Sequence, residues 1–195
     1  MNNQVLSIRR ILERSAMGFL FILAACLQAN DSSSLFSSKI NDEEVKIALN
    51  DYRLVSVPRE IGTLKSVRDL TIGYETSEWT IYPPPDAHLK NTDQPPFYYL
   101  PEEICTLTNL ESLALDGLKI KELPENFGRL KNLKFLSLAF NKLVLKKEIS
   151  KLQNLTNLKT LILYGNKVDD NSVLILKEKI PGIDVKYKME PTYVK

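Results

Sequence analysis

Four stretches of the chain carry the same spacing of apolar residues, and this repetition constrains the fold more than any other feature. The copies are Val57-Pro58-x-x-Ile61-x-x-Leu64-x-x-Val67, Leu100-Pro101-x-x-Ile104-x-x-Leu107-x-x-Leu110, Leu123-Pro124-x-x-Phe127-x-x-Leu130-x-x-Leu133 and, without the proline, Leu145-x-x-x-Ile149-x-x-Leu152-x-x-Leu155. A motif that returns every ~20 to 30 residues is typical of solenoid proteins. Because one copy alone cannot bury its apolar side chains, consecutive copies are expected to stack.

Each copy continues into a second motif that predicts a short strand. Its instances are Val67-x-x-Leu70-x-Ile72-x-x-Glu75, Leu110-x-x-Leu113-x-Leu115-x-x-Leu118-x-Ile120, Leu133-x-x-Leu136-x-Leu138-x-x-Asn141-x-Leu143 and Leu158-x-x-Leu161-x-Leu163-x-x-Asn166-x-Val168. The alternation of leucine with other residues is the two-residue period of a strand. A buried amide side chain both donates and accepts, so Asn141 and Asn166 can bind backbone groups where the chain leaves the strand.

These residues resemble the leucine-rich repeat, in the LPxxIxxL form common in bacteria, over roughly residues 55–187. The resemblance implies an α/β fold, a right-handed curved solenoid with short parallel strands on its concave face and a cap at each end. Leu118 and Glu75 stand where the family has asparagine. An asparagine ladder is therefore expected only in the last two full turns, and the N-terminal half is expected to be the looser one. The copy without proline predicts a more helical back segment near 148–156.

Residues 1–25 are expected to be a signal peptide. Three arginines precede an apolar run over 16–25 that is too short to span a bilayer comfortably. The run ends in Leu23-Ala24-Ala25-Cys26, which resembles a bacterial lipobox and implies lipidation of Cys26. An uncleaved anchor or a chance cysteine is the alternative. Several acyl chains would hold the protein stably at a membrane. The expected location is the cell envelope, at the outer membrane or the cell surface.

The rest of the chain divides into four segments around a single domain. Residues 26–40 are expected to be the lipidated cysteine and a flexible tether of ~20 Å, and 41–56 an N-terminal helical cap with Val45, Ala48 and Leu49 on one side. The repeats occupy 57–168. Residues 169–195 are expected to form a C-terminal cap, with a helix over 170–180 that Asp170 caps, a last strand over 183–187 and a tail.

An insertion over 76–99 separates the first two copies. It holds five of the ten prolines, the only tryptophan (Trp79), the only histidine (His88) and Tyr82. Long irregular loops in compact domains are uncommon and often functional, and a proline run holds the backbone extended. One interpretation is a binding loop with Trp79 and Tyr82 as anchors. The other is a degenerate repeat whose aromatic residues pack back on the domain.

The strand positions that point away from the core identify a candidate binding surface. Phe135, Ile162 and Tyr164 fall on the C-terminal half of the expected concave face, and Phe140 either joins them or packs beside the asparagine turn. Apolar clusters framed by charges often mark protein-binding surfaces.

No residue pattern indicates catalysis, a metal site or a cofactor. The single histidine argues against His-based zinc sites and catalytic pairs. Cys105 stands where Gly62 and Gly128 stand in sister copies, which favours a small buried filler over a reactive thiol. Loss of residues 1–25 would leave 23 residues of each charge, which argues against a nucleic-acid partner.

The function expected from the sequence is therefore that of a non-enzymatic, exported, lipid-anchored protein. It would act as a monomer and bind another protein, a host protein being one option, through the concave face and the insertion. The alternative is a structural envelope lipoprotein that contacts the cell's own proteins or glycan. An enzyme that uses His88 or Cys105 is a third and weaker reading.

Overall fold

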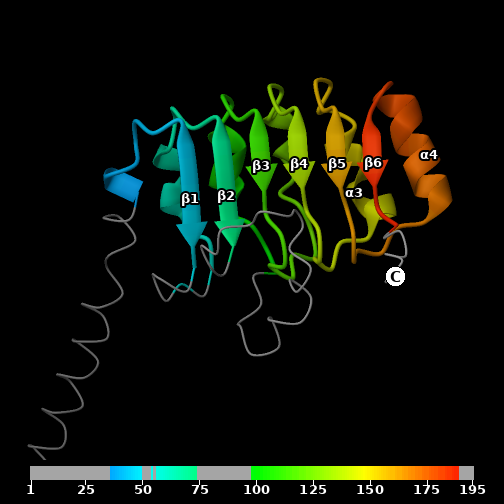
Figure 1. Cartoon of the computed structure of the whole chain (residues 1–195), viewed down its shortest axis with the longest axis horizontal. Helices are drawn as coiled ribbons and strands as arrows, with labels where there is room; N and C mark the ends of the chain where they lie inside the picture. The colour runs from blue at the N-terminus through cyan, green and yellow to red at the C-terminus, as the bar shows by residue number, and fades with distance from the viewer. Residues whose placement is uncertain (1–35, 50–53, 55, 74–97, 189–195) are drawn as a thin grey trace, which may run out of the picture.

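The computed structural model describes residues 36–49, 54, 56–73 and 98–188, and these form a single six-stranded sheet (Figure 1). All neighbouring strands are parallel, and their order in the sheet is their order in the chain. The strands are β1 (Glu44–Ala48), β2 (Asp69–Gly73), β3 (Ser112–Ala114), β4 (Phe135–Ser137), β5 (Thr160–Ile162) and β6 (Asp184–Lys186). Such an order requires each connection to cross behind the sheet in the same sense as the one before it.

The register of the sheet follows the sequence repeat. Leu70, Leu113, Leu136 and Leu161 face one another across β2 to β5, and the β6 position opposite Leu161 is Val185. At the start of the strands, the backbone nitrogens of Glu111, Lys134 and Lys159 each donate to the equivalent residue one strand earlier, at 2.8 Å. Equal spacing in the chain thus places equivalent residues in columns across the sheet.

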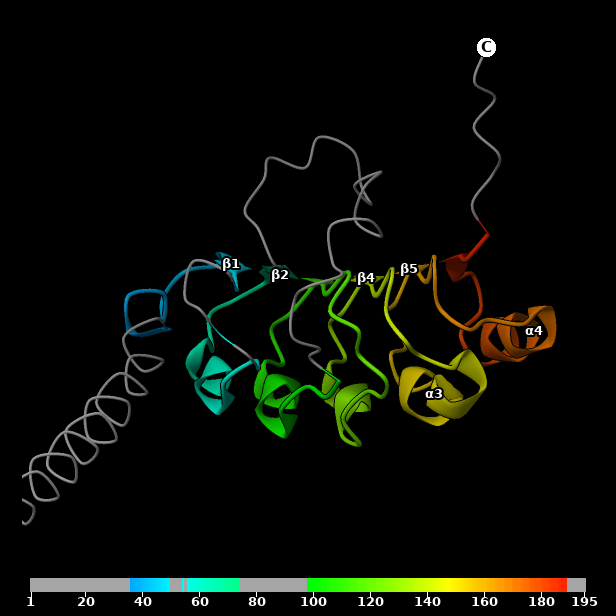
Figure 2. The same ribbon diagram turned by 90° about the horizontal axis from the view of Figure 1, so that it is seen from below.

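Five helical segments return the chain along one side of the sheet (Figure 2). They are the 3-10 segments η1 (Arg59–Thr63), η2 (Glu102–Thr106) and η3 (Phe127–Arg129) and the α-helices α3 (Leu145–Leu152) and α4 (Asp170–Lys179). An extended proline directly precedes η1 and η2. The copy without proline forms α3, which confirms the expected helical back segment. Proline restricts its own φ and the conformation of the preceding residue, so the backbone is held extended directly before η1 and η2.

One buried core lies between the strands and the helical segments. It contains the repeated leucines and isoleucines, except for the half-buried Ile149, together with Phe36, Phe127 and Leu176. In the copy without proline, Glu148 is buried in place of Ile149. Each fully buried aliphatic side chain contributes roughly 1.5–3 kcal/mol, so every turn depends on the neighbours that cover it.

The expected helical cap over 41–56 is wrong, because residues 44–48 form strand β1. Val45 and Ile47 are buried while Glu44 and Lys46 are exposed, which is the alternation of a half-buried strand. β1 pairs with β2 along its whole length. The tether expected over 26–40 also ends early, since Phe36 is buried in the core and accepts a hydrogen bond from Lys39 N at 2.9 Å.

The C-terminal helix and last strand form where the sequence predicts them, although Asp169 and not Asp170 caps α4. The Asp169 carboxylate accepts from Ser172 N at 2.9 Å and from Ser172 Oγ at 2.6 Å. The carboxylate of Asp170 accepts instead from the Tyr187 hydroxyl at 2.9 Å and from Lys188 Nζ at 3.0 Å. Asp170 therefore joins the start of α4 to the residues that follow β6.

Two columns of asparagines bind the turns to one another. In the expected ladder, Asn141 Nδ2 donates to Leu115 O at 2.7 Å, and Asn166 Nδ2 donates to Leu138 O at 2.7 Å. A second column, which we call the outer asparagines, was not anticipated. Asn109, Asn132 and Asn157 donate to Lys65 O, Thr108 O and Lys131 O at 2.8 to 2.9 Å. Each bond reaches one turn back along the chain, so these amides fix the spacing of consecutive turns.

Within the described residues, no helix is both long and apolar enough to cross a membrane. The expected signal peptide over 1–25 and the expected lipidation site, Cys26, lie outside the part of the chain that the structure describes.

Candidate functional site

The candidate site is the sheet surface turned away from the helical segments, which we call the strand face. Its side chains come from the first and third positions of each strand, because the second position points into the core. The first column runs Glu44, Asp69, Ser112, Phe135, Thr160, Asp184, and the second runs Lys46, Thr71, Ala114, Ser137, Ile162, Lys186. Phe135 and Ile162 thus lie on the face of the sheet where the repeat predicts them.

The structure places the expected aromatic cluster on strands β4 and β5 and the turn after β5. Phe135 and Tyr164 are half-buried, whereas Ile162 is only 5% exposed. Ile162 is nevertheless outside the main core cluster, as its outward position requires. Phe135 and Tyr164 thus present most of the accessible apolar surface of this set.

Phe140 lies in the turn after β4 and not in a strand. Its backbone is left-handed, with φ 55°, and Phe140 N donates to Tyr164 O at 2.6 Å. A Cβ built on Gly165 would lie 2.7 Å from Phe140 Cδ1, so the ring is packed against that glycine. This arrangement matches the alternative in which Phe140 packs beside the asparagine turn.

A row of charged residues crosses the start of the strands. The Glu111 carboxylate accepts hydrogen bonds from both Arg68 and Lys134, on the strands to either side. The hydrogen bond from Lys134 and the positive charge of Arg68 lower the pKa of Glu111, whereas desolvation raises it. The net effect holds this pKa below its usual value. The next residue in the row, Lys159, is exposed and has no carboxylate within 4.0 Å among the described residues.

Asp116 is a carboxyl group whose burial no sequence motif predicts. It follows β3 and is 5% exposed. Its Oδ1 accepts from Ser137 Oγ and from Ala139 N, both at 2.7 Å, whereas Oδ2 has no hydrogen-bond partner. Burial raises the pKa of Asp116 to about 7, against these two bonds, which lower it. Only the three-dimensional packing of Ser137 and Ala139 beside it identifies this residue.

Trp79, Tyr82 and His88, all within the insertion over 76–99, lie outside the described residues. Their expected roles therefore stay predictions.

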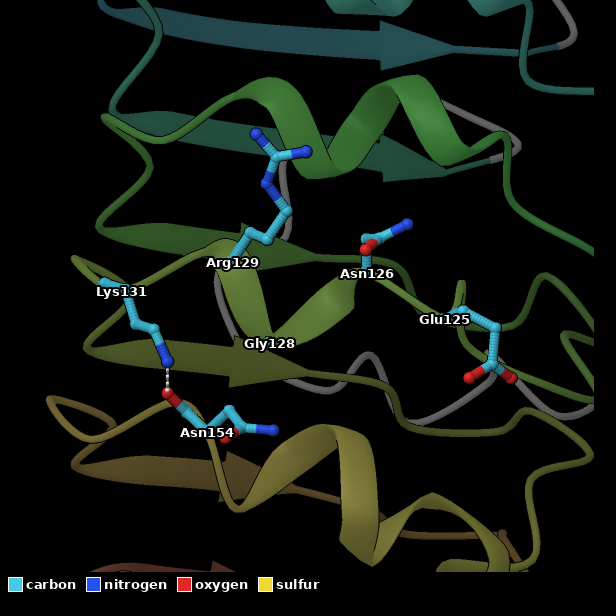
Figure 3. A pocket seen from close by; sticks show the side chains of 6 residues that line it. All are labelled: Glu125, Asn126, Gly128, Arg129, Lys131 and Asn154. Carbon is cyan, nitrogen blue, oxygen red and sulfur yellow. Dashed lines mark hydrogen bonds between the residues drawn. The ribbon is translucent and has the colours of Figure 1, made fainter.

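The helical side of the molecule has a small polar hollow of about 260 Å³ between η3 and α3 (Figure 3). Its lining residues are Glu125, Asn126, Gly128, Arg129, Lys131 and Asn154. Lys131 Nζ closes one side by donating to Asn154 O at 2.6 Å. A Cβ on Gly128 would lie 2.6 Å from Asn154 Cβ, so glycine allows η3 and α3 to approach closely. The lining holds no histidine or cysteine, and its groups serve mainly to join two turns.

A buried ion pair also holds α3 against the turn before it. Glu148 and Lys151 are both almost inaccessible. Glu148 Oε2 accepts from Leu123 N at 3.1 Å, and Lys151 Nζ donates to Leu123 O at 2.7 Å. Lys151 also lies 3.0 Å from Glu122 and 3.2 Å from Glu125. These charged side chains bind the backbone at Leu123, so their role is structural.

Cys105 is buried in η2 at the position of Gly62 in η1 and Gly128 in η3, as the filler interpretation predicts. Burial and the nearby Glu102 carboxylate raise its pKa to about 12, which leaves almost no thiolate at neutral pH. In the part of the chain that the structure describes, no three His, Cys, Asp or Glu residues come together as metal ligands would.

Comparison with known proteins identifies similar segments in proteins of much greater length. A solved structure of the Leptospira interrogans LRR protein LIC12759 superposes with a TM-score of 0.51 and 25% identity, over 67% of this chain and 28% of that one. The probable disease resistance protein At1g61300 of Arabidopsis thaliana is 40% identical over 88 residues, which are 45% of this chain and 11% of that protein. A uridine 5'-monophosphate transferase of Xanthomonas campestris is 31% identical over 98 residues, 15% of its length.

No family model matches the chain. The chain spans only a minor part of each of these relatives, so their activities as whole proteins do not transfer to it. The repeated motif, the parallel sheet in chain order and the likeness to the Leptospira structure together support a protein of the leucine-rich repeat family.

Proposed function

We propose that this protein binds another protein through its strand face. The observation that carries the proposal is the placement of Phe135 and Tyr164, half-buried and apolar, among charged side chains on the surface opposite the core. Exposed aromatic groups framed by charge are typical of protein-binding surfaces. The likeness to a leucine-rich repeat structure supports an interaction role as well. The insertion over 76–99 is proposed to contribute further contacts through Trp79 and Tyr82.

The test is affinity capture with the full-length protein and a variant that carries Phe135→Ala, Ile162→Ala and Tyr164→Ala. Loss of the captured partner is expected, together with a loss of thermal stability from Ile162→Ala, because Ile162 is only 5% exposed. Leu174→Ala is the matched control, because Leu174 on α4 is 61% exposed on the opposite side of the molecule. If the triple variant unfolds, Tyr164→Ala alone decides the question, since Tyr164 is outside the core cluster. Capture that survives in Tyr164→Ala contradicts the proposal.

The proposed function includes export and anchoring by a lipid on Cys26, at the outer membrane or the cell surface. The lipobox-like residues Leu23-Ala24-Ala25-Cys26 and the basic and apolar stretch before them support it. A surface position would make a host protein accessible as the partner. Cys26→Ser is expected to abolish metabolic incorporation of palmitate, whereas Cys105→Ser is expected to leave it intact. Labelling of the Cys26→Ser variant would contradict this part of the proposal.

We propose no catalytic activity for the chain. The raised pKa of Cys105 and its burial support this for the thiol, since a nucleophile must reach its substrate as a thiolate. Any activity found in the wild type that disappears in a Cys105→Ser, His88→Ala variant would overturn the proposal. Capture of glycan in place of protein would instead favour a structural role in the envelope.

A further inference from the structure

Charge is distributed unevenly along the strand face and the residues that lead into its strands. Over β1 to β3 these positions carry four carboxylates and two cations, namely Glu43, Glu44, Asp69 and Glu111 with Lys46 and Arg68. Over β4 to β6 they carry three lysines and one carboxylate, namely Lys134, Lys159 and Lys186 with Asp184. One half of the surface is therefore acidic and the other basic.

The ion pairs do not neutralise the basic half. Lys134 shares the Glu111 carboxylate with Arg68, so one negative charge serves two cations. Lys186 lies 3.8 Å from Asp184 and its side chain remains 48% exposed. Lys159 is adjacent to Lys134 in the row and has no ion-pair partner among the described residues. An excess of positive charge is left around β5.

This excess charge lies on both sides of an apolar patch. Ile162 is the register partner of Lys186, and Lys159 directly precedes β5, three residues before Ile162. Tyr164 follows at the end of β5 and is half-buried. A side chain that packed on Tyr164 would have within reach one ammonium group from the residue before β5 and one from the neighbouring strand β6, because lysine stems span several ångströms.

We propose that the partner contacts β4 to β6 through a segment in which carboxylates flank an apolar side chain. Lys159 and Lys186 bind the carboxylates, and the half-buried ring of Tyr164 receives the apolar group. The assignment rests on the proposed protein-binding function and specifies the chemistry of its partner. Charge complementarity of this kind speeds encounter and excludes partners of the wrong sign.

The acidic half explains why a protein segment is favoured over a long polyanion. Neighbouring strands are ~4.8 Å apart, so a nucleic acid or an extended anionic glycan lying across the sheet would soon meet Glu111, Asp69 and Glu44. A short acidic segment can stay within β4 to β6 and avoid that repulsion.

The experiment uses random peptides displayed on phage, selected against the immobilised full-length protein. Enrichment of peptides with Asp or Glu on both sides of an aliphatic or aromatic residue is expected. A Lys159→Glu, Lys186→Glu variant should bind the selected peptides at least ~10-fold more weakly, and raised salt should weaken the wild-type complex. The matched control is Lys146→Glu, Lys147→Glu, which changes the net charge equally at exposed positions in the first turn of α3 and should bind as wild type.

Several results would overturn the inference. They are selection of peptides without carboxylates, no selection at all, equal binding by the reversed and wild-type proteins, and tighter binding of heparin than of any selected peptide. Peptides that bind the reversed variant normally but fail on Tyr164→Ala would refute the acidic partner and leave the protein-binding role intact. Peptides that bind every variant equally would refute both.

Discussion

The Asp116 side chain is expected to make stability depend on pH. Its folded pKa, about 7, lies above the ordinary value of 3.8, so the folded protein holds a proton that the unfolded chain releases. The stabilising effect of that proton is complete below pH ~4 and is lost as the pH rises through ~7. Relative to an Asp116→Asn variant, the wild type should lose on the order of 4 kcal/mol of unfolding free energy across that window.

Urea unfolding of both proteins at a series of pH values measures this difference. A gap that does not change between acidic and neutral pH would show that the buried carboxyl does not retain its proton.

Substitution of Gly165 and Gly182 by alanine distinguishes two energetic costs of an added methyl group, which are backbone strain and overpacking. Both have positive φ, 69° and 82°, but a Cβ would touch Phe140 only at Gly165 and would meet nothing within 4 Å at Gly182. Gly182→Ala should cost about 1 kcal/mol from backbone strain, and Gly165→Ala about 1–3 kcal/mol more from overpacking against the ring. Thermal and urea denaturation compare them. Equal losses would mean that the Phe140 ring moves aside freely.

At the scale of single residues, the sequence predicts which residues align across neighbouring strands better than it predicts how buried each side chain is. The repeat correctly aligns Phe135, Ser137 and Ile162 with their neighbours, because register follows from equal spacing. It cannot predict that Ile162 is nearly inaccessible or that Asp116 is buried, because those depend on side chains from adjacent strands.

At the scale of elements, α3 depends on the buried pair Glu148 and Lys151. Replacing Lys151 with alanine leaves the Glu148 carboxylate buried without its cation, which should cost about 3 kcal/mol. Glu148→Ala should cost less, because Lys151 keeps Glu122 and Glu125 as ion-pair partners. The double variant Glu148→Ala, Lys151→Ala should lose clearly less than the two single losses combined, because no uncompensated buried charge remains.

A double-mutant cycle by urea unfolding tests this coupling. Additive losses would indicate that each side chain stabilises Leu123 independently, through its own bond to the backbone.

The element that the sequence mispredicts is the first one. Val45, Ala48 and Leu49 have helical spacing, but Val45, Ile47 and Leu49 also alternate as a strand does. Residue spacing alone cannot choose between the two over so short a segment. Pairing with β2 decides, since it satisfies the backbone of β1 and buries Val45 and Ile47 at once.

At the scale of the whole molecule, the two halves should differ in local stability. Asn141 and Asn166 bind backbone groups of adjacent turns in the C-terminal half, whereas Leu118 occupies the equivalent position one turn earlier. Amide hydrogens of β4 and β5 should therefore exchange more slowly than those of β1 and β2. Hydrogen exchange with mass spectrometry measures the rates of each strand. Uniform exchange along the sheet would show that apolar stacking, and not the asparagine ladder, sets local stability.

Much of the overall arrangement follows from the sequence because every turn repeats the same packing of a strand against a returning segment. The α/β class and the parallel strands are implied by the resemblance to the leucine-rich repeat, and the helical segment is predicted by the copy without proline. For the binding surface, the sequence predicts only which residues share a column across the strands. Its division into an acidic and a basic half emerges when β1 and β6 are added, since neither belongs to a full copy of the motif.

The outer asparagines have a consequence for how such a chain can change in length. Asn132 and Asn157 each bind only the turn directly before them, so every link in this column is between nearest neighbours. Duplication of one 23-residue unit, such as 110–132, would recreate the same links on both of its sides and leave distant turns untouched. Evolution can therefore extend or shorten the recognition surface in whole-strand steps, without redesigning the residues already in place.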